Sequence, residues 1–113
     1  MHRTILPSDQ AMSDAVFDIV WDQAKALSNI AKHRVTFTQA ATVLLDPLAL
    51  TVFDAANSQT EDRWFTLGQS SEGRLLAVSH TYRDIDGNRA QIRLISAREA
   101  TRQEQQHYQN YGQ

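Results

Sequence analysis

The sequence predicts an α+β domain in which helices pack on one face of an antiparallel sheet. Three observations support this fold class. The chain has 113 residues, 42% of them hydrophobic and 21% charged, which suffices for one core but not for two. Apolar residues recur with helical spacing before Asp46-Pro47 and alternate as in strands after it. The separators in the second half are short, so consecutive strands there are expected to form antiparallel hairpins.

The domain is expected to begin after an N-terminal arm. Residues 1–16 show no sustained periodicity, which predicts a flexible segment and leaves residues 17–113 as the single domain. From Phe17 to Trp21 the side chains follow the two-residue period of a short strand. The domain should therefore open with a strand.

Two helices are predicted after this strand. Asp22 can cap the first helix, which extends to His33 and carries its apolar residues on one side. Thr36 and Gln39 form the capping-box pattern of the second helix. Asp46-Pro47 should end it, because the residue before a proline avoids helical backbone.

Four strands and a last helix complete the prediction. The strands cover residues 50–53, 63–67, 75–82 and 89–95. In the third strand the residues that point to either face are apolar, as expected for a central strand that is covered on both faces. The last helix has a capping box at either Ser96 with Glu99 or Thr101 with Glu104. The predicted order is β-α-α-β-β-β-β-α.

The charges are distributed unevenly. The formal net charge is -2, which argues against a protein that holds nucleic acid by bulk electrostatics. Up to Asp62 there are four basic and eight acidic residues, whereas from Arg63 onward there are seven arginines and five acidic residues. Guanidinium groups form paired hydrogen bonds with phosphate, so the arginines of the second half are candidates for a local anion site.

Several kinds of site and location are excluded by composition. With no cysteine, the chain has no thiolate metal site, disulfide or cysteine nucleophile. Its four histidines lack the short paired spacing of metal-binding helices, and there is no glycine-rich phosphate loop, so we expect neither a metal nor a cofactor. No apolar run is long enough to span a membrane, and we expect a cytoplasmic protein without a membrane partner.

Three arginines of the second half are candidate phosphate ligands. Arg93 lies on an otherwise apolar strand, where a guanidinium must meet solvent, a carboxylate or a ligand. Arg98 follows near the start of the last helix, and Arg83 lies at the end of the neighbouring strand. Structural ion pairs are the alternative for Arg93 and Arg98, with Glu104 or Asp62 as partner.

Other residues are candidates for proton transfer or RNA binding. His33 and His80 have the side chain that titrates near neutral pH, although His33 can instead cap its helix and His80 can be a buried hydrogen-bonded histidine. Lys25 and Lys32 share one helix flank, which can follow a nucleic-acid backbone or simply be solvated. Arg63 begins a strand, and its direction stays open.

Many stretches of the chain match one known family in order and spacing. They are Phe17-Asp18-Ile19-Val20-Trp21-Asp22-Gln23-Ala24-Lys25, Asn29, Lys32-His33-Arg34-Val35-Thr36-Phe37, Ala40-Ala41, Asp46-Pro47, Glu61-Asp62-Arg63, Leu67-Gly68, Gly73-Arg74, Ile92-Arg93-Leu94-Ile95-Ser96-Ala97-Arg98, Ala100-Thr101, Glu104 and Tyr108. On these residues the chain resembles the BrnT family of bacterial ribonuclease toxins. The resemblance covers about residues 17–108. Arg34 departs from it, since many family members have glycine after the first helix, where left-handed backbone is easiest for glycine.

The resemblance implies a RelE-like fold and a toxin that cleaves RNA and inhibits translation and growth. A ribonuclease without metal uses the 2′-hydroxyl of its substrate as nucleophile, so the protein supplies a base, an acid and cations. We expect catalytic roles, either proton transfer or contact with the phosphate, for His33, Lys25, His80, Arg63, Arg83, Arg93 and Arg98. We expect RNA binding by Lys25, Lys32, Arg63 and Arg98.

The resemblance also implies a partner. A BrnA-like DNA-binding antitoxin is expected to mask the toxin and repress the operon, with a toxin dimer inside a heterotetramer as one arrangement. The alternative function is a non-catalytic binding module that assembles with the DNA-binding antitoxin and tunes repression.

Overall fold

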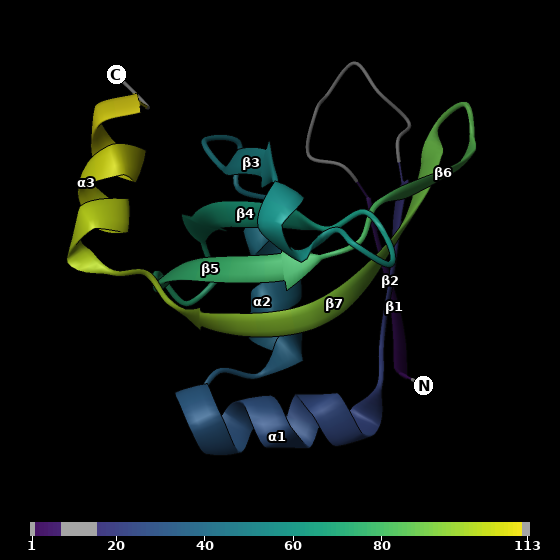
Figure 1. Cartoon of the computed structure of the whole chain (residues 1–113), viewed down its shortest axis with the longest axis horizontal. Helices are drawn as coiled ribbons and strands as arrows, with labels where there is room; N and C mark the ends of the chain where they lie inside the picture. Colours follow the sequence, from purple (N-terminus) through teal and green to yellow (C-terminus); the bar gives the residue numbers. More distant parts are fainter. Residues whose placement is uncertain (1, 8–15, 112–113) are drawn as a thin grey trace.

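A seven-stranded mixed sheet forms the centre of the fold (Figure 1). The computed structural model describes residues 2–7 and 16–111. The strands are β1 (His2–Pro7), β2 (Val16–Trp21), β3 (Leu50–Phe53), β4 (Trp64–Gln69), β5 (Leu75–His80), β6 (Arg83–Asp86) and β7 (Arg89–Glu99). The helices are α1 (Gln23–His33), α2 (Phe37–Val43) and α3 (Arg102–Tyr111), with a short 3₁₀ helix at Ala55–Asn57. The α+β class is confirmed.

Strand β7 is the centre of the sheet. The strand order is β1-β2-β7-β5-β4-β3, and β6 pairs with β7 beside this path. β2 runs parallel to β7, with Val16 opposite Arg89, while every other pair is antiparallel. The prediction of an antiparallel sheet is therefore wrong at this one pair. The prediction assumed that neighbouring strands are joined by short turns, which force an antiparallel pairing. β2 and β7 are instead separated along the chain by two helices and four strands.

Two strands of the structure were not predicted. The expectation of a flexible arm over residues 1–16 is wrong for His2–Pro7, which form β1 and pair with β2 over six residues; residues 8–15 lie outside the described part. The predicted strand 75–82 ends at His80. The chain then turns at Thr81, whose N–H donates to the carbonyl of Arg93, and continues as β6. The observed order is β-β-α-α-β-β-β-β-β-α.

The helix starts agree with the predictions. Asp22 caps α1 by accepting from the N–H of Ala24 at 2.8 Å, and Thr36 caps α2 by accepting from Gln39 at 3.0 Å. Arg34 ends α1 in the left-handed conformation, with φ 57°, which an arginine adopts less readily than a glycine. α2 ends at Val43, before Asp46-Pro47, where the sequence predicted its end.

The start of α3 selects between the two capping boxes. Thr101 and Glu104 each accept from the other's backbone N–H, at 3.1 and 2.9 Å. The alternative at Ser96 and Glu99 is wrong, because β7 continues through both residues and pairs with β5 as far as Glu99. A capping box needs extended backbone only at its first residue.

The core lies between the sheet and the first two helices. Buried Ile19, Leu76, Val78 and Ile92 of the sheet pack against α1 and α2, and α2 lies behind the sheet in Figure 1. α3 packs on the other face, where its Tyr108 contacts a second cluster formed by Leu67, Ala77 and Ala100. Successive residues of a strand point to opposite faces of the sheet. Leu76 therefore belongs to the first cluster and its neighbour Ala77 to the second.

The prediction that all helices share one face is therefore wrong for α3. Its apolar residues are too few to occupy the main core, and none of its described residues is fully buried. Among the described helices, none is long and apolar enough to cross a membrane.

Candidate functional site

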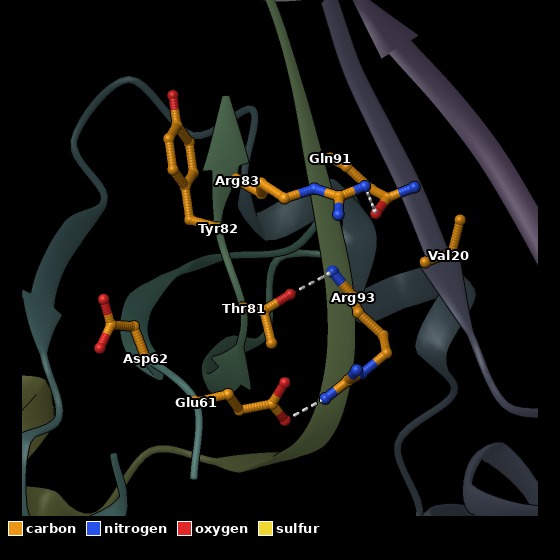
Figure 2. Close-up of a pocket in the computed structure, with 8 residues that line it drawn as sticks. All are labelled: Val20, Glu61, Asp62, Thr81, Tyr82, Arg83, Gln91 and Arg93. Carbon is orange, nitrogen blue, oxygen red and sulfur yellow. Dashed lines mark hydrogen bonds and ion pairs between the residues drawn. The ribbon is translucent and has the colours of Figure 1, made fainter. Parts of the chain in front are cut away.

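A pocket of about 370 Å³ opens beside β7, on the face opposite α2. Arg93 pairs with Val20 in the sheet, and Ile92, the residue before Arg93, is in the core. Because successive strand residues point to opposite faces, the Arg93 side chain and the pocket lie on the face away from that core. We call it the arginine pocket, and its lining residues are Val20, Glu61, Asp62, Thr81, Tyr82, Arg83, Gln91 and Arg93 (Figure 2).

Arg93 is held in this pocket by its backbone and by its side chain. Its N–H donates to the hydroxyl of Thr81 at 3.1 Å, and its carbonyl accepts from the Thr81 N–H at 3.0 Å. The side chain is 36% exposed, and its guanidinium donates to the carboxylate of Glu61. Figure 2 shows the Glu61 carboxylate turned toward Arg93 and the Asp62 carboxylate pointing away from it. The predicted carboxylate partner of Arg93 exists, but it is Glu61 and not Asp62.

Arg83 reaches the same pocket from the neighbouring strand. Its Nη2 donates to the side-chain oxygen of Gln91 at 3.0 Å. This partner is neutral, and in the part of the chain that the structure describes Arg83 forms no ion pair with a carboxylate. The pocket therefore contains a guanidinium that forms no ion pair with any carboxylate of residues 2–7 and 16–111.

Arg63 lies next to the pocket through Glu61. β4 begins at Trp64, so Arg63 precedes the strand, which settles the direction that the sequence left open. Its Nη2 lies 4.0 Å from Oε1 of Glu61. The Glu61 carboxylate thus faces two guanidiniums, one from the loop before β4 and one from β7.

Tyr82 stands at the rim of the arginine pocket and is 44% exposed. Partial burial raises the pKa of its phenol above the ordinary value, and the nearby Asp84 carboxylate raises it further. The phenol is therefore protonated at neutral pH. An exposed aromatic ring beside cationic side chains is a surface on which a nucleobase can stack.

A second pocket, of about 350 Å³, lies between α1 and β7. We call it the lysine pocket, and its lining residues are Lys25, Ser28, Asn29, Lys32, His33, Ile95 and Ser96. It contains three of the predicted site residues, and none of its lining residues in the described part of the chain is a carboxylate. The shared helix flank of Lys25 and Lys32 therefore faces a cavity.

Asn29 and a bulge in β7 shape the lysine pocket. The buried Asn29 side chain donates to the carbonyls of Val35 and Ala97, at 2.9 and 2.8 Å, and accepts from the Ala97 N–H at 3.0 Å. These bonds fix α1 to the edge of β7. Ser79 pairs with Ser96 and His80 with Leu94, so Ile95 is the extra residue of the bulge.

The two pockets follow each other along one strand. Arg93 lines the first, and Ile95, two positions later in the same strand, lines the second. The structure therefore brings five of the predicted residues to two adjacent cavities. These residues are Arg83 and Arg93 in the first and Lys25, Lys32 and His33 in the second.

Arg98 lies apart from both pockets, near the other end of β7. Its Nη1 and Nη2 donate to the two carboxylate oxygens of Glu104, at 2.8 and 3.0 Å, and its guanidinium carbon lies 5.8 Å from the centre of the Phe65 ring. The hydrogen bonds from Arg98 lower the pKa of Glu104, and the same bonds raise the pKa of Arg98. This is the structural ion pair that the sequence left as an alternative.

His80 lies behind the arginine pocket rather than in it. The residue is 2% exposed, and burial lowers the pKa of the imidazole below its ordinary value. Nδ1 lies 2.8 Å from the carbonyl oxygen of Thr81, and Nε2 lies 2.7 Å from the hydroxyl of Thr66. A carbonyl can only accept, so Nδ1 carries the proton and Nε2 accepts from Thr66. Neither nitrogen is free for a substrate.

Two residues of the site were not singled out from the sequence. Glu61 belongs to the stretch Glu61-Asp62-Arg63, which stood out only as part of the resemblance, and Tyr82 was assigned to a strand end. The three consecutive charged residues before the strand were the feature of the sequence that could have marked Glu61 as a site residue. Within the described residues, no three His, Asp or Glu side chains are grouped so that they could hold a metal ion.

The chain as a whole is similar to proteins of known family and structure. A family model described as "Ribonuclease toxin, BrnT, of type II toxin-antitoxin system" matches residues 21–104. The chain is similar to the crystal structure of the Brucella abortus ribonuclease toxin BrnT, with a TM-score of 0.52 and 26% identity, over 74% of this chain and 96% of that one. No curated protein matches the chain.

Proposed function

Because the chain belongs to the BrnT family of ribonuclease toxins of type II toxin–antitoxin systems, we propose that it is an endoribonuclease that cleaves RNA without a metal ion. In this reaction the 2′-hydroxyl of one nucleotide attacks the adjacent phosphodiester, and the 5′-oxygen leaves. The observation that carries the proposal is the arginine pocket, in which Arg83 and Arg93 from neighbouring strands face one cavity with Glu61. A toxin of this kind inhibits translation and growth.

Arg83 and Arg93 are the proposed contacts of the scissile phosphate. A phosphorane-like transition state concentrates negative charge on the phosphate oxygens, and preorganised cations stabilise it more than they stabilise the ground state. Arg83 has only a neutral partner, and Arg93 has five N–H donors, of which Glu61 occupies part. Each guanidinium is expected to contribute about 10²- to 10³-fold to the rate.

The lysine pocket is the proposed binding site for the neighbouring part of the RNA backbone. Lys25, Lys32 and His33 line it together with Ile95, which follows Arg93 by two positions on β7. We assign these three side chains a binding role, because proton transfer needs hydrogen-bond contact with the reacting groups and none of the three lines the arginine pocket. Tyr82, at the rim of the arginine pocket, is proposed to stack on a base next to the cut.

Cleavage in a chelator tests the proposed reaction. The purified chain is incubated with single-stranded RNA in excess EDTA, and the 5′ fragment is analysed for a 2′,3′-cyclic phosphate. A matched RNA with 2′-deoxyribose at the cut site should stay intact at that position. Cleavage of the substituted strand, or loss of activity in EDTA, would refute 2′-hydroxyl transesterification without metal.

Membership of a type II family implies an antitoxin partner, and we propose a BrnA-like DNA-binding protein. The surface that supports this is a groove of about 330 Å³ between α3 and the open face of β3 and β4. Leu50, Val52, Phe65 and Leu67 form its floor, and Val52 is 57% exposed. Exposed apolar patches of this kind mark protein contacts. We further propose that two toxins assemble with the antitoxin as a heterotetramer.

The same groove favours the second candidate function, a binding module without catalysis that tunes operon repression. Induced expression without the antitoxin distinguishes the two. Growth arrest with RNA fragmentation supports the ribonuclease, whereas normal growth with intact RNA supports the module. Light scattering of the co-expressed pair tests the assembly, and two separate monomers would contradict it.

A further inference from the structure

A carboxylate lies among the phosphate-binding cations of the arginine pocket. Glu61 accepts a hydrogen bond from Arg93, faces Arg63 at 4.0 Å and is 38% exposed. It lines the cavity itself, so its oxygens are accessible to a molecule bound there. In the cleavage reaction the attacking 2′-oxygen belongs to the nucleotide whose phosphate is held. The group that removes its proton must therefore lie beside the phosphate-binding cation, as Glu61 lies beside Arg93.

The other proton acceptors are in the wrong places. His80 is buried, and both of its ring nitrogens are engaged. His33 and Lys25 line the lysine pocket. Asp62 lines the arginine pocket, but it is turned away from Arg93 in Figure 2 and forms no ion pair within the described part of the chain. Glu61 is the carboxylate of the pocket that combines access to the cavity with contact to a cation.

We propose that Glu61 is the general base of the cleavage reaction, an inference that rests on the proposed ribonuclease function. Its carboxylate takes the proton of the 2′-hydroxyl while the 2′-oxygen forms a bond to phosphorus. The bond from phosphorus to the 5′-oxygen breaks, and the 5′-oxygen takes a proton from water. The products are a 2′,3′-cyclic phosphate and a 5′-hydroxyl, and no oxidant or metal takes part.

Arg93 has two tasks in this arrangement. One N–H holds Glu61 in the pocket, and the others remain available to the phosphate oxygens. Arg93 thus sets the position of the base relative to phosphorus. Its own position is fixed by the two backbone bonds to Thr81. The base is therefore preorganised by a residue anchored in the central strand, as general-base catalysis requires.

The variant Glu61→Gln tests the proposal. The amide oxygen of glutamine can still accept from Arg93, so a merely structural role of Glu61 would survive this change, whereas the capacity to remove a proton is lost. We expect kcat to fall about 10²- to 10⁴-fold, with KM changed less than tenfold and an unchanged melting temperature. Asp86→Asn removes an exposed carboxylate of β6 that lines neither the arginine pocket nor the lysine pocket, and it should alter kcat less than about threefold.

A substrate with sulfur in place of the 5′-oxygen separates a base from an acid. A thiolate leaves without protonation, so this substrate restores the activity of variants that lack the general acid but not of variants that lack the base. Glu61→Gln should remain as impaired on the sulfur substrate as on ordinary RNA. Full recovery on that substrate, or wild-type kcat on ordinary RNA, overturns the proposal for Glu61. If the wild-type chain itself leaves RNA intact, the proposed function fails instead.

Discussion

The Nδ1 nitrogen of His80 lies 2.8 Å from the carbonyl oxygen of Thr81, the residue whose N–H and hydroxyl bind the backbone of Arg93. The buried imidazole therefore fixes the turn between β5 and β6. Through its two hydrogen bonds to Arg93, Thr81 then holds the part of β7 from which the Arg93 side chain enters the arginine pocket. We therefore expect His80 to act on the site through Thr81, as a positioning residue.

The same histidine makes the stability of the protein depend on pH. Burial lowers the pKa of His80 in the folded state, whereas the unfolded chain has a pKa of about 6.5. The unfolded state therefore binds the proton more readily. The contribution of neutral His80 is complete above about pH 6.5 and is lost as the pH falls below it, until the folded-state pKa is reached. The loss is at most about 1.4 kcal/mol per pH unit.

Urea unfolding of the wild type and of His80→Asn, at pH 7.5 and at pH 5.5, measures this dependence. The asparagine variant does not titrate in this range and should be less stable at pH 7.5, by about 1 to 3 kcal/mol for the lost hydrogen bonds. The stability difference between the two proteins should shrink at pH 5.5. An unchanged difference would show that His80 does not carry the pH dependence.

Removal of the Arg83 guanidinium should affect catalysis more than folding. We expect Arg83→Ala to lower kcat/KM about 10²- to 10³-fold, because Arg83 faces the cavity and has only Gln91 as partner. Steady-state cleavage of a fluorescent RNA and thermal unfolding provide the two measurements. Gln91→Ala removes the partner but keeps the charge, and it should cost much less activity. Equal losses for both variants would assign Arg83 a structural role.

Much of the fold was predictable because it depends on neighbours in the chain. The caps Asp22 and Thr36 act on residues two or three positions away, and the sequence pattern identified both. The pairing of β2 with β7 joins Val16 to Arg89, and no local pattern specifies that contact. β1 and β6 were missed for a related reason, since each is stabilised mainly by backbone pairing with a strand that lies elsewhere in the fold.

The candidate site was predictable only in part. Strand alternation predicted that Arg93 points away from the core, and it does. Its partner Glu61 lies 32 residues earlier in a loop, so the contact exists only in the folded chain. Arg98 carries the same charge on the same strand, yet Glu104 in the first turn of α3 binds it. Sequence alone does not distinguish a guanidinium that faces a cavity from one that is already paired.

The lysine pocket predicts a change in salt dependence. Lys32→Ala should weaken binding of single-stranded RNA and reduce the slope of log K against log salt by about 0.7, because one phosphate fewer is neutralised by the protein. Binding titrations at several salt concentrations with a 2′-deoxy analogue measure this without cleavage. Lys32→Arg keeps the charge and should retain the wild-type slope. Wild-type binding by the alanine variant would place Lys32 on a solvated face.

Tyr82 distinguishes stacking from hydroxyl chemistry at the rim of the arginine pocket. If a base stacks on the exposed ring, Tyr82→Leu should weaken RNA binding by about 1 to 3 kcal/mol, because leucine is apolar but has no π-face. Tyr82→Phe keeps the ring and removes only the phenolic hydroxyl, so its affinity and kcat should stay near those of the wild type. A phenylalanine variant as impaired as the leucine variant would show that the protonated hydroxyl, and not the ring, is what the RNA requires.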